Sequence, residues 1–133
     1  MALFQSGDFG VEAHATFEEN ALAKARHFHR LSGMLTVADD SGLEVDALGG
    51  APGVHSKRWS GVRTSDTKVL DAANNAALLQ RLDGVGDRRA RFVCAAAAVD
   101  SRTSIAVRGE VAGTVATSLR GSGGFGYDAC FVP

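Results

Sequence analysis

The sequence predicts one domain of the α/β class, in which helices and strands follow one another along the chain. Apolar residues recur at helical spacing in 16–32 and again in 66–82. Short runs with apolar or alternating character, bounded by glycine, aspartate and serine, lie between and after these helices and have the length of strands. The chain has 133 residues, which is enough for one hydrophobic core, so we expect 1–133 to form a single domain.

The composition excludes several classes of protein. The net charge is −1, so no basic field favours binding to a nucleic-acid polymer. No run reaches the roughly 18 apolar residues that a membrane helix needs, and the first ten residues lack the basic start of a signal peptide. Of the two cysteines, Cys94 lies in an apolar run and is expected to be buried and reduced. We therefore expect a cytoplasmic protein that has no membrane partner.

The first helix is expected to start after Thr16 and to end at Ser32-Gly33. Residues 1–15 carry no clear pattern and are expected to be irregular. Thr16 followed by Glu19 is a capping-box pattern, so Glu19 either caps the helix or directs its carboxylate toward a functional site. These two interpretations do not exclude each other. The charged side chains of this helix are expected to face solvent: Lys24, Arg26, His27 and Arg30.

The most distinctive stretch is Asp39-Asp40-Ser41-Gly42, which follows a short apolar strand at Leu35–Ala38. We expect it to form a tight acidic turn at the end of that strand. Adjacent carboxylates repel each other unless a positive charge lies beside them. A hard divalent cation such as Mg²⁺ suits them, because it takes oxygen ligands and few of them from protein. A solvated turn explains the same residues equally well.

The middle of the chain combines a half-buried strand, Leu43–Ala47, with a glycine-rich loop. After the loop, Lys57, Arg58 and Trp59 could bind phosphate oxygens, form a surface patch or contact another subunit. His55 has no second histidine at ligand spacing, so we expect no metal role for it.

A second helix is expected from Ser65 or Asp66 to about Leu82, with the Asn74-Asn75 pair exposed. Arg91–Val99 and Ile105–Val107 are expected to form antiparallel strands joined by a turn. Strand character continues past Gly113 to about Thr117 and returns at the end of the chain.

The segment Gly121–Asp128 is rich in glycine and contains two aromatic residues. Glycine lets the backbone approach a ligand closely, and Phe125 or Tyr127 offers a face on which a planar ring can stack. Asp128 offers an acceptor for ring N–H groups. The alternative is a glycine-rich linker in which the aromatic residues have no special role.

Three segments in this order and at these distances carry a resemblance that none of them carries alone. They are Thr16–Arg26, then Ala38–Leu43 continued by Val45–Val54 and Ser56–Gly61, and finally Gly123–Asp128. Together they resemble the inosine/xanthosine triphosphate pyrophosphatase family, which acts on non-standard purine nucleoside triphosphates. The resemblance covers nearly all of the chain from Thr16 onward.

The resemblance implies an elongated mixed β-sheet with flanking helices and a nucleotide cleft between two lobes. It implies Mg²⁺-dependent hydrolysis of deaminated purine triphosphates (ITP, dITP and XTP) to the monophosphate and pyrophosphate, in a nucleotide-pool cleansing role. It also implies a homodimer.

The resemblance further implies roles for individual residues. Asp40 matches the acidic residue that binds metal and is taken as the general base, and Ser41 matches a residue that contacts substrate. The metal-binding carboxylates are Glu19, Asp39 and Asp40. The segment that holds the base is Phe125, Gly126, Tyr127 and Asp128.

The chain also departs from the family pattern. Nothing in Met1–Ala15 matches the family's Ser/Thr-Gly-Asn-x-x-Lys loop or the strand before it, and the later lysine and Ser-His-Arg segment are absent. Val111-Ala112-Gly113 replaces Trp-Pro-Gly, and Asp128-Ala129 replaces Asp-Pro. We therefore expect the N-terminal strand-loop and the C-terminal segment of the fold to be missing. Two hypotheses follow: an enzyme in which Lys57, Arg58 or a dimer partner supplies the phosphate-binding charge, or a catalytically inactive, truncated module that binds nucleotide or protein.

Overall fold

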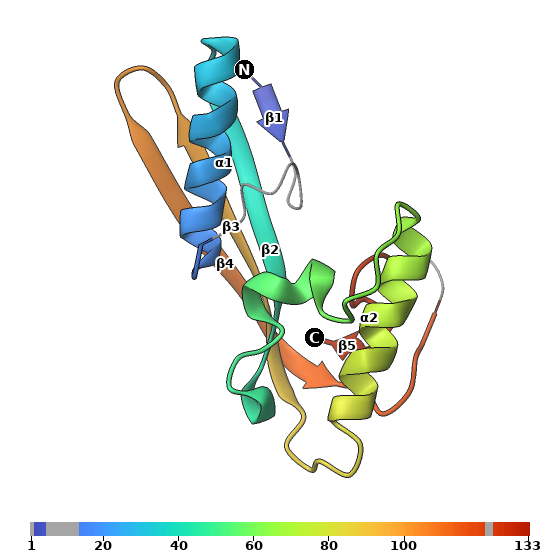
Figure 1. The fold of residues 1–133 in the computed structure, drawn as a ribbon. Helices are drawn as coiled ribbons and strands as arrows, with labels where there is room; N and C mark the ends of the chain where they lie inside the picture. Colours follow the sequence, from blue (N-terminus) through green and yellow to red (C-terminus); the bar gives the residue numbers. More distant parts are fainter. Residues whose placement is uncertain (1, 5–13, 122–123) are drawn as a thin grey trace. The chain divides into compact units, whose positions relative to one another are not determined.

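The structure is a computed structural model that describes residues 2–4, 14–121 and 124–133 (Figure 1). Gly123, the first residue of the segment Gly123–Asp128 that carries the resemblance, lies outside the described residues. The helices are α1 (Phe17–Ser32), α2 (Thr67–Arg81) and two short 3₁₀ helices, η1 (Asp46–Leu48) and η2 (Gly53–Arg58). The strands are β1 (Ala2–Phe4), β2 (Thr36–Val45), β3 (Arg89–Val99), β4 (Ser104–Val115) and β5 (Phe131–Val132).

The strands form one mixed sheet in the order β1-β2-β3-β4-β5. β1 pairs with β2 in parallel, and β4 pairs with β5 antiparallel. The turn Asp100–Thr103, closed by the Asp100 N–H to Thr103 O bond of 2.9 Å, joins β3 to β4 as a hairpin. The predicted α/β class with a mixed sheet and flanking helices is confirmed. No helix among the described residues is long and apolar enough to cross a membrane.

The chain divides into two compact units. The first unit contains Met1–Ser41 and Val93–Glu110, and the second contains Gly42–Phe92 and Val111–Pro133. Buried apolar residues of the first unit come from α1, β2 and β3: Phe17, Ala21, Ala25, Phe28, Ala38, Val93, Ala95, Ala97 and Val99. The core of the second unit contains Leu43, Val45, Leu78, Leu82, Ala90, Val115, Tyr127 and Cys130.

Both long helices begin where their capping residues predict. Thr16 Oγ1 accepts the Glu19 N–H at 3.1 Å, which satisfies one of the N–H groups that the first turn of α1 leaves open. Gly33 ends α1 with a left-handed φ of 68° and donates to His29 O. Asp66 Oδ1 accepts the Lys68 N–H at 3.0 Å and caps α2.

Several expectations about secondary structure are wrong. The acidic stretch is not a turn, because Asp39 to Gly42 lie inside the continuous ten-residue strand β2. Residues 1–15 are not irregular throughout, since Ala2–Phe4 form β1 beside Thr36–Ala38. The chain therefore has a short strand where the family's N-terminal strand was expected to be missing. The strand predicted at Leu43–Ala47 ends at Val45, where η1 begins.

Three burial expectations are also wrong. Cys94 is exposed, while Cys130 is buried. Asn74 and Asn75 are each 3% exposed, and their amides donate to backbone carbonyls of η2 and of the loop at Gly126. Lys24 is completely buried and does not belong to the solvated face of α1.

β4 passes through glycines that the sequence pattern treats as interruptions. Gly113 lies where β5 approaches closely: a Cβ there would overlap Val132 O and the ring of Phe131. The missing side chain therefore lets the last strand pair with β4, and the two predicted strand segments form one strand, Ser104–Val115.

Candidate functional site

In the first unit, Asp39 and Asp40 lie side by side along β2. Successive side chains of an extended strand point to opposite faces. The burial pattern follows that rule: Asp40, 3% exposed, shares the buried face with Ala38, whereas Asp39 is half-buried with Ser41 on the other. The converging pair of carboxylates that a tight turn would give is therefore replaced by one carboxylate on each face.

Asp39 carries a buried oxygen, Oδ1, for which the described residues provide no hydrogen-bond partner. Leaving such a group unsatisfied costs about 1–3 kcal/mol, and more for a charged group. Cys94 on β3 is also affected by the negative charge of these carboxylates. Partial burial, followed by the charges of Asp39 and Asp40, raises the pKa of its thiol. The acidic part of β2 thus forms a region that favours a cation.

Lys24 is the functional candidate that the sequence prediction missed. Its side chain is fully buried, and Nζ donates to Asp39 O at 2.8 Å. Burial of an ammonium group is costly unless it is paired and hydrogen-bonded, so this lysine requires partners of the kind that the acidic strand provides. Helical spacing could have found it, because Lys24 lies three residues after Ala21 and four before Phe28, on the apolar stripe of α1.

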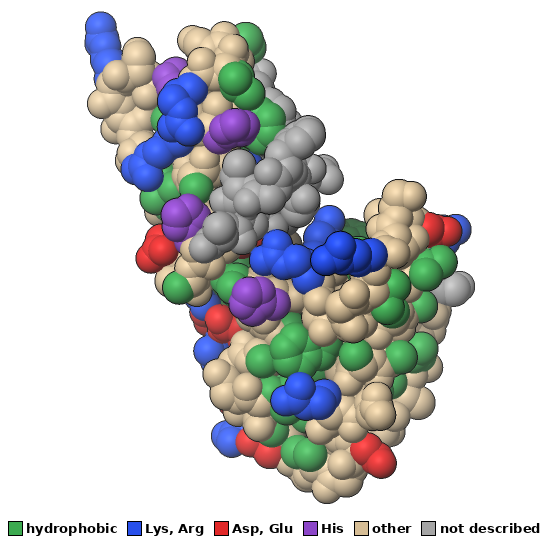
Figure 2. Space-filling model, in the orientation of Figure 1, with side chains coloured by type: hydrophobic (Ala, Val, Ile, Leu, Met, Phe, Trp, Pro, Cys, Tyr) green, Lys and Arg blue, Asp and Glu red, His purple; other side chains and the backbone are tan. Residues whose placement is uncertain are grey.

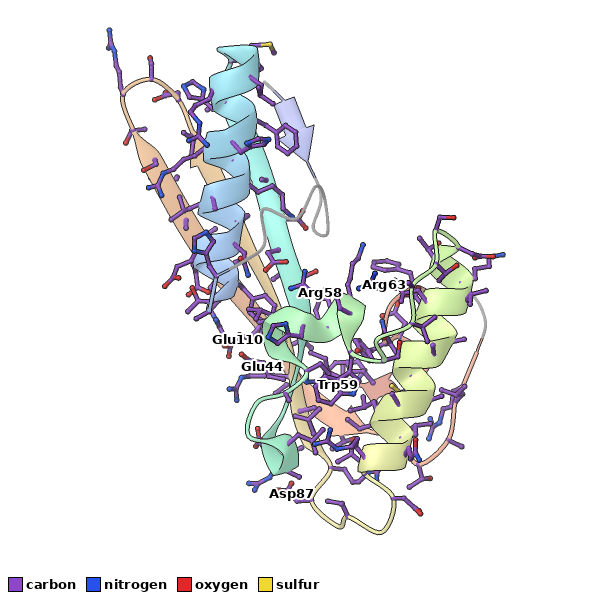
Figure 3. All side chains as sticks on the ribbon, in the orientation of Figure 1. Glu44, Arg58, Trp59, Arg63, Asp87 and Glu110 are labelled. Carbon is purple, nitrogen blue, oxygen red and sulfur yellow. The ribbon has the colours of Figure 1, made fainter. Side chains whose placement is uncertain are left out.

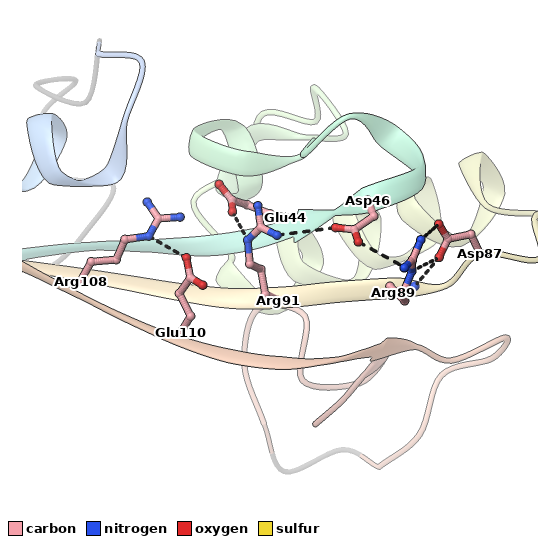
Figure 4. Close-up of polar contacts among 7 residues, drawn as sticks. All are labelled: Glu44, Asp46, Asp87, Arg89, Arg91, Arg108 and Glu110. Carbon is pink, nitrogen blue, oxygen red and sulfur yellow. Dashed lines mark hydrogen bonds and ion pairs between the residues drawn. The ribbon is translucent and has the colours of Figure 1, made fainter.

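Glu19 lies in the first turn of α1 and is exposed, with Oε2 4.0 Å from His14 Nδ1. Its neighbour Glu18 pairs with Arg108 Nη1 at 2.9 Å. Figure 4 shows the second pair of this arginine, between Arg108 Nε and Glu110 at 2.8 Å. Within the described ranges, no group of three or more His, Cys, Asp or Glu residues is placed to hold a metal ion. The structure therefore does not assemble the three predicted carboxylates into a ready ligand cluster.

In the second unit, the two aromatic residues of the loop Gly124–Asp128 differ in their exposure to solvent. Phe125 is 78% exposed. Tyr127 is 6% exposed, its hydroxyl donates to Ser56 O at 2.6 Å, and burial is the main cause that raises the pKa of this phenol. Of the two predicted stacking faces, only Phe125 is available, and the expectation for Tyr127 is wrong because its ring fills the core.

Asp128 closes the same loop on itself. Its exposed carboxylate accepts the Phe125 N–H through Oδ2 at 3.1 Å, and its own N–H donates to Phe125 O. A Cβ at Gly124 would lie 2.5 Å from the Asp128 Cβ, so this close approach needs glycine. Gly126 adopts a left-handed φ of 58°, which also favours glycine. The glycines therefore shape a defined loop rather than a flexible linker.

The segment η2 is fixed to the same unit by buried polar groups. Ser56 Oγ accepts the Leu43 N–H at 2.9 Å, and Asn74 Nδ2 donates to Lys57 O at 3.0 Å. The Lys57 and Arg58 side chains are exposed on this anchored segment. Figure 3 shows where Arg58, Trp59 and Arg63 lie. The Arg81 guanidinium lies 5.3 Å from the centroid of the Trp59 ring. Trp59 thus packs within the unit, whereas the two cations remain accessible.

Other charges of the second unit form a chain of ion pairs (Figure 4). Arg91 Nε lies 2.6 Å from Glu44, Arg91 Nη1 lies 3.7 Å from Asp46, and Arg89 joins Asp46 to Asp87. The Arg89 side chain lowers the pKa of Asp87 to about 2. Side chains of both signs are also exposed on the face drawn in Figure 2, in keeping with the net charge of −1.

Comparison with known proteins decides the family. The model of the Ham1 family matches residues 3–133. The chain belongs to the Ham1 family. It is 56% identical over 124 residues to a dITP/XTP pyrophosphatase of Mycobacterium tuberculosis (strain ATCC 25618 / H37Rv), covering 92% of this chain and 58% of the relative. It is also 56% identical over 129 residues to that of Nocardia farcinica, covering 95% and 60%.

Solved structures agree with this membership. A nucleoside-triphosphatase / dITP/XTP pyrophosphatase from Mycobacterium abscessus superposes with a TM-score of 0.79 at 48% identity, covering 90% of this chain and 62% of that one. The Ham1 protein of Staphylococcus aureus superposes with a TM-score of 0.81 at 40% identity, covering 90% and 60%. The resemblance predicted from the sequence is confirmed, and the chain spans about three fifths of these relatives' length.

Proposed function

We propose that this Ham1-family chain is a nucleoside triphosphate pyrophosphatase for deaminated purine nucleotides (ITP, dITP and XTP). It would release the monophosphate and pyrophosphate with Mg²⁺ as cofactor, act as a homodimer in the cytoplasm, and cleanse the nucleotide pool. The observation that carries the proposal is the 56% identity to relatives named dITP/XTP pyrophosphatase. The family match at residues 3–133 spans both the acidic strand and the exposed Phe125 loop.

The donor atoms of the acidic strand suit magnesium. Asp39 Oδ1 is a buried carboxylate oxygen with no hydrogen-bond partner in the described residues. Mg²⁺ binds through one or two carboxylates and keeps several waters, so it does not require a preformed cage of three protein ligands. We propose Asp39, Asp40 and Glu19 as the residues that hold it. Because Asp39 and Asp40 lie on opposite faces of β2, the three would not all bind the ion directly, and water molecules would complete its coordination. When bound, the ion would neutralise phosphate charge and increase the acidity of a water molecule.

Asp40 is the candidate general base. Its side chain is fixed on a β-strand, and the residue is 3% exposed. A carboxylate can accept a proton from a water molecule that attacks phosphorus, once substrate binding brings that water within hydrogen-bond reach of it. Lys24, through its bond to Asp39 O, brings a buried positive charge to the same strand and opposes the repulsion between the neighbouring acids.

Phe125 is the candidate platform for the purine ring. Its exposed face can stack on any base, so selection for the six-position oxo group must come from polar groups around it. A site that donates to an oxo group disfavours adenine, because the amino group then faces another donor. We propose that Gly126, Tyr127 and Asp128 shape these polar groups, that Ser41 contacts the substrate, and that Lys57 and Arg58 attract its phosphates.

The experiment that tests this function is pyrophosphate release across ITP, XTP, dITP, ATP and GTP with Mg²⁺. We expect turnover of the deaminated nucleotides and little turnover of ATP, whose six-position amino group would face a donor. Binding of ITP without pyrophosphate release, even at high protein concentration, would instead support the catalytically inactive binding module.

A further inference from the structure

We propose that Asp71 and Asn75 of α2 are positioning residues that fix the loop Gly124–Asp128 and thereby set its preference for oxo-purine bases. This inference rests on the proposed function, because it assigns the loop to the base of the nucleotide. Neither residue belongs to the predicted site, and neither needs to touch the substrate.

The two side chains hold both backbone polar groups of one glycine. Asp71 Oδ2 accepts the Gly126 N–H at 2.9 Å, and Asn75 Nδ2 donates to Gly126 O at 2.8 Å. Positions i and i+4 of a helix lie on one face, so α2 presents the acceptor and the donor together. The glycine peptide groups are therefore held from both sides by a single rigid element.

Asn75 has a fully used amide group. It is 3% exposed, Nδ2 also donates to Asp71 O at 2.7 Å, and Oδ1 accepts from Cys130 Sγ at 2.9 Å. The two carbonyl partners require the NH₂ end, so only one orientation of the amide fits. The thiol must be protonated to donate, and burial raises the pKa of Cys130 to about 11. The arrangement is thus complete at neutral pH.

The loop depends on this anchoring because packing does not hold its exposed ring. Phe125 is 78% exposed, so its direction is set by the backbone on either side. One side is the Asp128 carboxylate bonded to the Phe125 N–H, and the other is Gly126 with its left-handed φ of 58°. Releasing Gly126 would displace the polar groups of the loop, on which selection for the oxo group depends, together with the ring. The core, which Tyr127 anchors through Ser56 O, would stay in place.

The consequence is a separation of binding from catalysis. Removing a residue that only orients a binding group weakens substrate affinity but leaves the rate of the chemical step unchanged. Asp71 should therefore affect KM and the discrimination between ITP and ATP, and leave kcat nearly unchanged.

The test compares Asp71→Ala with Asp71→Asn, whose amide oxygen can still accept the Gly126 N–H. Asp83→Ala is the matched control, since Asp83 is an exposed acid beyond the end of the same helix. Binding of ITP and ATP is followed with EDTA by the fluorescence of Trp59, the single tryptophan, which packs against the core cluster containing Tyr127. Steady-state kinetics with Mg²⁺ give kcat and KM, and amide exchange reports the Gly126 bond directly.

We expect Asp71→Ala to weaken ITP binding and raise KM about tenfold, which corresponds to about 1.4 kcal/mol, with kcat changed less than about twofold. Affinity for ATP should change little, and Asp71→Asn should restore most of the ITP affinity. Asn75→Ser, too short to reach Gly126 O, is a second variant with the same expectation if Asp71→Ala melts below the assay temperature.

Unchanged ITP affinity in Asp71→Ala, together with faster exchange of the Gly126 amide, would overturn the inference. An equal loss for ITP and ATP would overturn it too, because that pattern indicates a structural role alone. If the wild-type chain binds ITP without hydrolysing it, the proposed hydrolysis fails while the affinity comparison still decides this inference. If the wild-type chain binds no purine nucleotide, the inference fails as well.

Discussion

Phe125 and Tyr127 are two aromatic residues of one loop for which the structure predicts opposite effects of mutation. Tyr127→Phe removes only a hydroxyl that donates to Ser56 O at 2.6 Å in a buried place. Phe125→Ala removes a ring that is 78% exposed. The first change should therefore lower stability and the second should lower nucleotide affinity.

The magnitudes follow from what each side chain contacts. Loss of the Tyr127 hydroxyl leaves a buried carbonyl oxygen unsatisfied, which costs about 1–3 kcal/mol. For a chain of this size that loss lowers Tm by roughly 3–6 °C for each kcal/mol. The exposed Phe125 ring contributes no buried surface to the core, so its loss should change the free energy of unfolding by less than about 0.5 kcal/mol. Base stacking on an aromatic ring contributes about 1–3 kcal/mol, so ITP should bind at least about fivefold more weakly.

The assay measures urea unfolding and ITP titration on the same preparations of wild-type protein and both variants. A Tyr127→Phe protein with unchanged stability would contradict the buried hydrogen bond to Ser56. A Phe125→Ala protein that binds ITP as wild type does would contradict the assignment of the exposed ring to the base. An equal effect of both changes on affinity would contradict the division of roles between the two rings.

Three further predictions concern packing, buried charge and pH. Gly113→Ala should destabilise the protein by more than about 1 kcal/mol in urea unfolding, because its Cβ overlaps β5; Gly109→Ala, whose Cβ meets nothing within 4 Å, is the control and equal losses would contradict the close approach. Lys24→Ala should cost about 2–4 kcal/mol, since it empties a buried site and removes the donor to Asp39 O; Lys24→Met, which refills the volume, should lose less, and a Lys24→Ala protein as stable as wild type would refute this burial. The pKa of Cys130 is raised from 9.0 to about 11 on folding, so its contribution to stability is present below pH 9 and is lost as the pH rises toward 11. Cys130→Ala should flatten this decline in the free energy of unfolding, and an unchanged slope would contradict it.

Local sequence patterns sufficed for elements that are determined by a few neighbouring residues. Thr16 caps the first helix as predicted, and Asp66, one of two predicted candidates, caps the second, because a side-chain oxygen three residues or fewer from an open N–H is enough. The hairpin turn at Asp100–Thr103 forms for the same reason, with Asp100 Oδ1 accepting two N–H groups of the turn.

The remaining features depend on partners distant in sequence. Gly42 and Ser41 are ordinary turn residues, yet pairing with neighbouring strands keeps them extended within β2, and the acidic turn does not form. Asn75 could be assigned to the core only by knowing that Gly126, 51 residues later, returns to α2. Lys24 was predicted to face solvent because of its charge, and its burial depends on the Asp39 carbonyl, 15 residues later, which accepts its bond.

The candidate site was predicted in the same uneven way. The sequence and its resemblance proposed the acidic residues and the aromatic loop as the parts that carry chemistry, and this proposal remains a prediction. They could not show that Asp39 and Asp40 lie on opposite faces of a strand, or that Tyr127 is a core residue. Burial in both cases is created by other segments of the chain, so it has no local pattern.

The most direct test of the account compares pyrophosphate release from ITP by the wild-type chain and by Asp40→Asn, with and without Mg²⁺. Asparagine keeps the size of this buried side chain but cannot accept a proton from water. The account predicts Mg²⁺-dependent release by the wild type and a loss of at least about 100-fold in kcat for the variant, with ITP still bound. Equal turnover by the two proteins would contradict the assignment of Asp40 as general base, and no release by the wild type would contradict the proposed function itself.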